Sequence, residues 1–354
     1  MYKYIPVIKS NISKRVLVDF CKNRGLSSSF VPLLEVGHTK SDTDGTGISE
    51  LLENFEKVFV DYVYFRYQKD KNTWDIDYKQ DVVGYIKNFS KQLNLEGEQA
   101  RMFKKKPIPV ISETFQEDTD TFGKFNNVYV KGKGEGFSEM AIRISFDENL
   151  AIDASILPFI SKMRDKDYVI IDSRRSSLIG EGRVTEYDSA LTDVINKIRT
   201  TNETVNLVLL NSRFKVRTDN GEEADHLHWP LLADKFKLFG YGDYLTETES
   251  GVGRYSSDFS INYYDYEARL FLKFQSSNGE KEVLEKIKKN ERVVKQISNH
   301  QSYCRYCRKI KDALDRGEGD DEFKKRRGEL VREHQLNSIS VNEMNSPHPS
   351  SVGK

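Results

Sequence analysis

Three charged residues interrupt apolar runs of the sequence. Asp61 lies in VFVDYVYF, Arg143 in AIRIS and Asp172 in VIIDSR. A charge inside an apolar run is costly to bury unless it pairs with an opposite charge or takes part in binding or catalysis. A carboxylate can serve as a general base or bind a divalent cation, and a guanidinium can hold an anion. These positions therefore indicate either a ligand site or a structural ion pair between Arg143 and one of the acids.

Other polar residues stand at the ends of further apolar runs or close to them. If the runs are parallel strands, their carboxyl ends meet at one edge or mouth. The acids expected to act as general base, or to hold a divalent metal, are Glu35, Asp61, Asp172 and Asp243. The residues expected to bind the rest of the ligand are Lys9, Arg143, Arg174, Gly240, Gly242 and Tyr244.

The segment GYGDY, residues 240–244, is a candidate for a backbone-lined anion site, and GVGRY at residues 251–255 repeats the pattern. Its glycines would let backbone amides approach a phosphate, and loops late in a barrel often do so. An isolated Gly-x-Gly is more often a simple turn. We therefore hold both interpretations open and expect the segment to be a loop.

A second group of possible ligands lies near the C-terminus, in HQSYCRYCRK. His300, Cys304 and Cys307 have metal-like spacing, but a closed zinc site needs four ligands. His334 is the remaining candidate, and no second cysteine pair exists. The sequence therefore favours two reduced thiols on a helix over zinc, and we assign no metal here.

The elements that would carry these residues follow a repeated pattern of short apolar runs and amphipathic segments. Eight runs occur, at residues 4–9, 30–36, 58–65, 107–113, 140–146, 167–174, 205–212 and 267–275. Strands alternating with helices indicate βαβ units and a parallel sheet. Eight units over about 250 residues predict an α/β fold, a (β/α)8 TIM-like barrel spanning residues 1–280.

The alternative is an open doubly wound α/β sheet. Such a sheet predicts a glycine-rich phosphate turn after the first strand, and KSNISKR contains no glycine. Beyond the barrel, residues 281–340 are rich in Lys, Arg and Glu and read as a helical extension packed on or beside it. Residues 341–354 are small and polar, and we expect a disordered tail.

Composition narrows the functional classes. Lys plus Arg and Asp plus Glu each number 55, so the net charge is zero and the chain as a whole is not basic enough to indicate nucleic-acid binding. Local basic runs such as FKKRRGELVR leave nucleic acid as a minority interpretation. Neither a signal-like segment nor a membrane-spanning run occurs, and three cysteines do not form a disulfide framework. We expect a cytoplasmic protein with no membrane partner.

Several segments resemble a known family. YIPVIK and FVPLLEV are similar to the opening strands of the beta protein family of bacteriophages and bacterial mobile elements, and GYGDY, EARLFLKF and VREHQLNSIS resemble later family segments. The resemblance implies a barrel and makes Lys9, Glu35, Asp243 and His334 recurrent positions. NHQSYCRYCRKIKD departs from the glycine-rich stretch of the family.

Two functions fit these patterns. The first is a phage or antiviral-defence barrel that binds or processes a phosphorylated or nucleotide-like ligand at its mouth. The second is a non-catalytic protein-interaction module of a phage–host conflict system. The patterns suit an enzyme and a sensor equally, and the only cofactor they suggest is a divalent metal.

Overall fold

The structure is a computed structural model, and it describes most of the chain. The described residues are 2–8, 11–36, 46–62, 65–68, 73–76, 82–84, 86–87, 106–112, 121–146, 152, 154–173, 184–211, 215–218, 221–224, 233, 235–243, 259–265 and 270–340.

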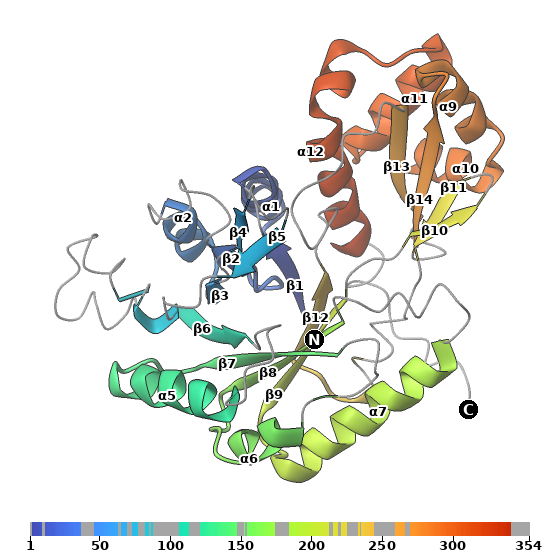
Figure 1. Cartoon of the computed structure of the whole chain (residues 1–354). Helices are drawn as coiled ribbons and strands as arrows, with labels where there is room; N and C mark the ends of the chain where they lie inside the picture. The colour runs from blue at the N-terminus through green and yellow to red at the C-terminus, as the bar shows by residue number, and fades with distance from the viewer. Residues whose placement is uncertain are drawn as a thin grey trace, which may run out of the picture.

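Eight parallel strands close into a barrel (Figure 1). The strands are β1 (Lys3–Ile8), β2 (Leu33–Val36), β3 (Val58–Tyr62), β6 (Pro107–Ser112), β7 (Ala141–Ser145), β8 (Tyr168–Ser173), β9 (Asn206–Asn211) and β12 (Gly240–Asp243). Their order around the barrel is β1-β12-β9-β8-β7-β6-β3-β2. The TIM-like barrel is confirmed, and the open doubly wound sheet is wrong because β1 and β2 pair and close the ring.

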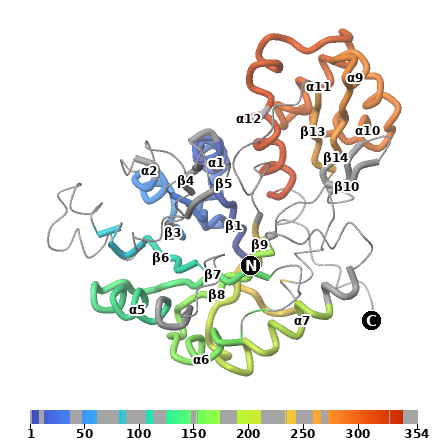
Figure 2. The backbone as a smooth tube through the Cα atoms, in the orientation of Figure 1, coloured from blue at the N-terminus to red at the C-terminus, as the bar shows by residue number. Residues whose placement is uncertain are grey.

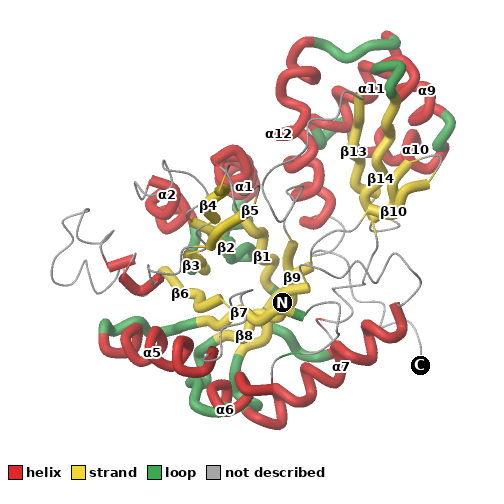
Figure 3. The backbone as a smooth tube through the Cα atoms, viewed as in Figure 1, coloured by secondary structure: helices red, strands yellow, loops and turns green. Residues whose placement is uncertain are grey.

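Helices cover the outside of the barrel, as the tube coloured by secondary structure shows (Figure 3). They are α1 (Asn11–Arg24), α2 (Thr46–Asn54), α5 (Thr121–Gly134), the short 3-10 helix η2 (Ala154–Ile156), α6 (Leu157–Ile160) and α7 (Val184–Thr201). In α1, Leu17, Val18 and Cys21 lie on one buried face. The helix stops where Gly25 adopts a φ of 65°, a left-handed conformation that favours glycine.

Alternation along the barrel strands separates two apolar layers, because successive side chains of a strand point to opposite faces. Ile142 and Ile144 of β7 belong to the outer core under the helices, whereas Ala141 belongs to the inner core of the barrel. The inner core also contains Leu33 and Phe59. This period of two determines which residues face the barrel interior.

The eighth strand differs from the prediction. GYGD forms β12, which pairs with β1 on one side and β9 on the other, so it is neither a loop nor a turn. A Cβ on Gly242 would lie 1.7 Å from the Ile5 carbonyl oxygen, and one on Gly240 would lie 2.4 Å from the Lys3 carbonyl oxygen. The two glycines therefore permit close strand pairing, which corrects their assignment to ligand binding.

The run at residues 267–275 is not a barrel strand. It contributes β14 (Leu270–Ser276) to a four-stranded antiparallel sheet with β10 (Lys215–Thr218), β11 (Gly221–Ala224) and β13 (Phe259–Asp265). In β14, Leu272 and Phe274 are buried while Lys273 and Gln275 are partly exposed. Such alternation is typical of an antiparallel sheet with one covered face. A separate hairpin pairs β4 (Phe65–Gln68) with β5 (Thr73–Ile76).

This second sheet and four helices form a C-terminal unit with its own hydrophobic core. The helices are α9 (Glu280–Lys288), α10 (Glu291–His300), α11 (Arg305–Arg316) and α12 (Asp321–Ser338). The barrel boundary predicted at residue 280 is therefore wrong, because β13 and β14 precede it and belong to the C-terminal unit. The predicted tail, residues 341–354, lies outside the described residues.

Helix α12 joins the C-terminal unit to the barrel, and the backbone tube shows it between the two (Figure 2). Leu336 and Ile339 are buried in the outer core of the barrel. The Arg24 guanidinium on α1 donates to the Asn337 side-chain oxygen at 2.8 Å. Among the described residues, no helix combines the length and apolarity that crossing a membrane requires.

Candidate functional site

A polar layer lies above the apolar core of the barrel interior. Five strands each place a polar residue two positions after an inward-facing apolar one, and a period of two keeps both on the same face. The pairs are Leu33 and Glu35, Phe59 and Asp61, Val110 and Ser112, Ala141 and Arg143, and Ile170 and Asp172. Because these residues follow the core toward the carboxyl ends of parallel strands, the layer lies on the side where barrel enzymes place their reacting groups.

Arg143 is the centre of this layer. Its Nη1 donates to Asp61 Oδ2 at 2.5 Å and its Nε donates to Asp172 Oδ2 at 2.7 Å. Its Nη2 lies 2.7 Å from Glu35 Oε1 and 2.6 Å from Asp172 Oδ2. One guanidinium therefore joins three carboxylates, which come from β2, β3 and β8.

Ser112 is a member of the layer that the sequence interpretation missed. Its hydroxyl donates to Asp61 Oδ2 at 2.6 Å, and its Cα is the register partner of Arg143. The signal was present, since Ser112 follows the inward Val110 by two residues in PIPVIS. A search for charged residues alone passes over a hydroxyl that fixes the orientation of a carboxylate.

The layer is buried and contains more acids than bases. The relative exposures of Arg143, Glu35, Asp61 and Asp172 are 2%, 2%, 1% and 1%. Three carboxylates surround one guanidinium, so the set attracts hydrogen-bond donors and cations and repels a bare anion.

The predicted cluster of Arg143 with Asp172 is confirmed, and Glu35 and Asp61 join it. Arg143 was predicted to hold the anion of a ligand, and in the structure its nitrogens contact carboxylates. Asp243 ends β12, with its backbone in register with Pro6 and Asn211.

The other predicted positions cannot be placed in this layer. Lys9, Arg174 and Tyr244 lie outside the described residues, and so does the side chain of Asp243. Gly240 and Gly242 lie within β12, where they serve strand pairing.

A different buried acid lies at the opposite, amino end of β8. Asp167 accepts hydrogen bonds from the backbone amides of Met140 and Arg164, both at 2.9 Å, and from the Tyr129 hydroxyl. Burial, followed by the hydrogen bond to Asp167, raises the pKa of Tyr129. These contacts bind the connections below the barrel together, so Asp167 is a structural acid.

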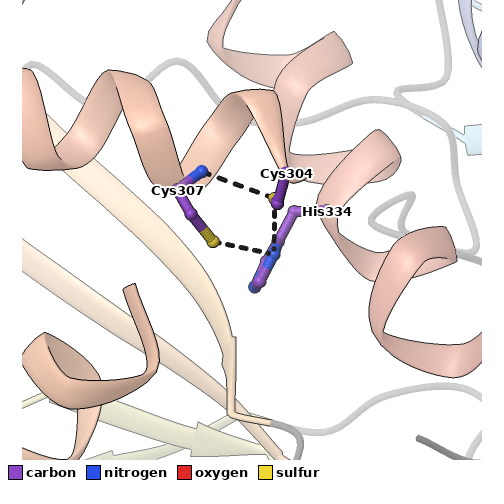
Figure 4. A group of neighbouring side chains, drawn as sticks. All are labelled: Cys304, Cys307 and His334. Atoms are coloured by element: carbon purple, nitrogen blue, oxygen red, sulfur yellow. Dashed lines mark hydrogen bonds between the residues drawn. The ribbon is translucent and has the colours of Figure 1, made fainter. Parts of the chain in front are cut away.

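The C-terminal unit brings together a set of possible metal ligands (Figure 4). Cys304, Cys307 and His334 are buried, and one ligand atom from each lies within 4.8 Å of the others. The hydrogen bond with Cys307 and the nearby His334 lower the pKa of Cys304, although burial opposes this shift. His300, which we had grouped with the cysteines, is not a member of this set.

Comparison with known proteins adds little to this description. No family model matches the chain, and no curated protein matches it. The structural matches include two crystal-structure studies of a chitinase from Pyrococcus furiosus, one of its catalytic domain and one of catalytic-site mutants of its active domain 2. Each has a TM-score of 0.41 and 10% identity, and covers 68% of this chain and 83% of that chain.

Proposed function

We propose that the chain is a barrel protein that binds a nucleotide-like, phosphorylated ligand at the carboxyl-terminal mouth of the barrel. The observation that carries the proposal is the buried layer in which Arg143 orients Glu35, Asp61 and Asp172 at one end of the strands. Carboxylates held in this way accept hydrogen bonds from the hydroxyl and amino groups of a ribose or base. A carboxylate can also act as a general base toward a bound hydroxyl.

The phosphates of such a ligand need positive charge, and the anionic layer does not supply it. Arg143 is committed to the acids, so the phosphates belong above the layer. Lys9 and Arg174 follow β1 and β8 directly in the sequence and remain our candidates for this role. A divalent cation on the acids is the alternative means of neutralising the phosphates.

The phage or antiviral-defence context rests on the resemblance of the N-terminal segments to the beta protein family. We propose a cytoplasmic location in a bacterial cell on the same grounds. The corresponding measurement is protection or toxicity in cells challenged with phage, compared between the wild type and the variants below.

Titration calorimetry of the full chain against nucleoside mono-, di- and triphosphates and sugar phosphates, with and without Mg²⁺, tests the binding function. We expect at least one compound to bind, and Asp61→Asn to weaken that binding at least tenfold. Asp193→Asn is the matched control because Asp193 is exposed on α7. Equal affinities in wild type, Asp61→Asn and Asp172→Asn would reject the proposal.

The second candidate function is a non-catalytic protein-interaction module. It is favoured by the C-terminal unit, whose separate core supports an exposed basic stretch at Lys324, Lys325 and Arg326. In this case the acids of the barrel serve stability alone. Lys325→Glu would then abolish the cellular phenotype. Asp61→Asn would weaken the phenotype only as far as it lowers the amount of folded protein.

A further inference from the structure

The three buried ligands of the C-terminal unit come from two helices. Cys304 precedes α11 as its N-cap, Cys307 lies in the first turn of α11, and His334 lies in α12. Figure 4 shows the two sulfurs and the imidazole pointing toward one another. His334 Nδ1 lies 3.4 Å from Cys304 Sγ and 3.6 Å from Cys307 Sγ.

These separations match the edges of a tetrahedral zinc site. With Zn–S bonds of about 2.3 Å and a Zn–N bond of about 2.0 Å, a tetrahedral angle places sulfur and nitrogen about 3.5 Å apart. A pair of ordinary thiol hydrogen bonds explains the arrangement less well. Nδ1 of a neutral imidazole has one lone pair, and here it faces two sulfurs at nearly equal distance.

The surroundings of the three ligands support metal binding. His334 Nε2 lies 3.0 Å from the Tyr264 carbonyl oxygen. A proton on Nε2 that bonds this carbonyl leaves Nδ1 free to coordinate, which is the usual outer-sphere arrangement of a metal-bound histidine. The Cys307 backbone amide donates to Cys304 Sγ at 3.4 Å, a contact that favours a thiolate.

A buried hydroxyl beside the set provides a second observation. The Tyr263 ring packs against the His334 imidazole, with centroids 4.6 Å apart. Tyr263 is 1% exposed, and its hydroxyl lies within hydrogen-bonding reach of Cys307. The hydroxyl therefore lies beside the ligand set, and it or a water would fill the fourth position of a tetrahedral site.

We propose that Cys304, Cys307 and His334 bind one zinc ion that stabilises the C-terminal unit. Two thiolates and an imidazole are ligands that suit zinc. The sulfurs are buried, with Cys304 1% and Cys307 0% exposed, which disfavours thiol exchange with another protein and suits a structural metal. The ion joins α11 to α12 and, through His334 and Tyr264, to β13.

The position of the ion connects it to the barrel. His334 lies close in sequence to Leu336 and Ile339, which are buried in the outer core of the barrel, and to Asn337, which contacts Arg24. Zinc binding at His334 therefore orders the end of α12 that docks on α1. Loss of zinc is expected to loosen this docking and leave the barrel strands closed.

The test is metal analysis of the full chain by inductively coupled plasma mass spectrometry after purification under reducing conditions. We expect about one zinc per chain in the wild type and in Cys21→Ser. Cys21 is the matched control because it is also a buried cysteine, located in the barrel core. Cys304→Ser and His334→Asn are expected to retain less than about one tenth of that zinc.

Substitution with Co²⁺ tests the geometry without relying on variants that fold poorly. Wild-type protein should show the intense ligand-field absorption of tetrahedral cobalt together with a thiolate charge-transfer band. Absence of bound zinc and of these bands in a folded, fully reduced wild-type chain would overturn the proposal. A Cys304–Cys307 disulfide in the purified chain, detected by intact mass after alkylation, would overturn it as well.

Discussion

Arg143 and Asp61 form an ion pair between strands that are not neighbours. Nη1 of Arg143 in β7 lies 2.5 Å from Oδ2 of Asp61 in β3, and β6 separates the two strands in the barrel order. The contact therefore spans the barrel interior, whereas backbone hydrogen bonds join only adjacent strands. The pair helps to fix the relative positions of β3 and β7 at the end that carries the candidate site.

Replacement of Arg143 by Met should destabilise the protein on the order of 3 kcal/mol, because it leaves buried carboxylates without their shared guanidinium. Chemical denaturation monitored by circular dichroism would measure the change. Lys197→Met on the exposed face of α7 is the control and should stay within about 0.5 kcal/mol. Equal stability of both variants would remove Arg143 from any structural role.

Gly242→Ala should destabilise the barrel by about 1–3 kcal/mol, because the new Cβ would collide with the Ile5 backbone. Gly134→Ala is the matched control, since nothing lies within 4 Å of its Cβ position at the end of α5. Alanine there should be neutral or stabilising by up to about 1 kcal/mol. Thermal melts of both variants would show opposite or clearly unequal shifts, and similar shifts would contradict the strand assignment.

The sequence predicted the barrel because its strands read as nearly continuous apolar runs, as in VNLVLLNS and DYVIIDSR. It missed β12 because GYGD contains only one large apolar residue and is four residues long. Glycine is needed here because the Ile5 backbone approaches closely, and this tertiary contact cannot be recognised from a local sequence pattern.

The candidate site was predicted in part. Asp61, Arg143 and Asp172 were visible as charges in apolar runs, but their charges alone could not show that Arg143 bonds to acids and not to a ligand. Cys304 and Cys307 have metal-like spacing, but the sequence favoured two reduced thiols, because the approach of His334 depends on how α12 packs against α11. That contact spans 30 residues and follows from tertiary packing.

Asp167→Asn should separate structural acids from functional ones. An amide oxygen cannot replace both carboxylate oxygens that receive the Met140 and Arg164 amides, so we expect a loss of about 1–3 kcal/mol in stability. Asp165→Asn, an exposed change in the same connection, is the control. Ligand affinity of the folded fraction should be unchanged in both, because Asp167 lies at the amino end of β8. A weakened affinity would mean that the ligand binds near the amino ends of the strands, which contradicts a site at their carboxyl ends.

Chelation of the bound metal should act locally. We expect faster amide hydrogen exchange in α11, α12 and β13 after treatment with a chelator, and unchanged exchange in β8 and β9, because the ligands join only the first three elements. Readdition of Zn²⁺ should restore protection. Uniform changes across barrel and C-terminal unit would contradict a local role for the ion.

The most direct measurement of the central claim is a crystal structure of the full chain with the tightest-binding compound from the calorimetric panel. We expect a hydroxyl or amino group of that compound within about 3.2 Å of a carboxylate oxygen of Glu35, Asp61 or Asp172, with Arg143 still bound to the acids. We also expect the phosphates to lie at the mouth of the barrel, away from Arg143. A compound bound elsewhere, or phosphates paired directly with Arg143, would contradict the account.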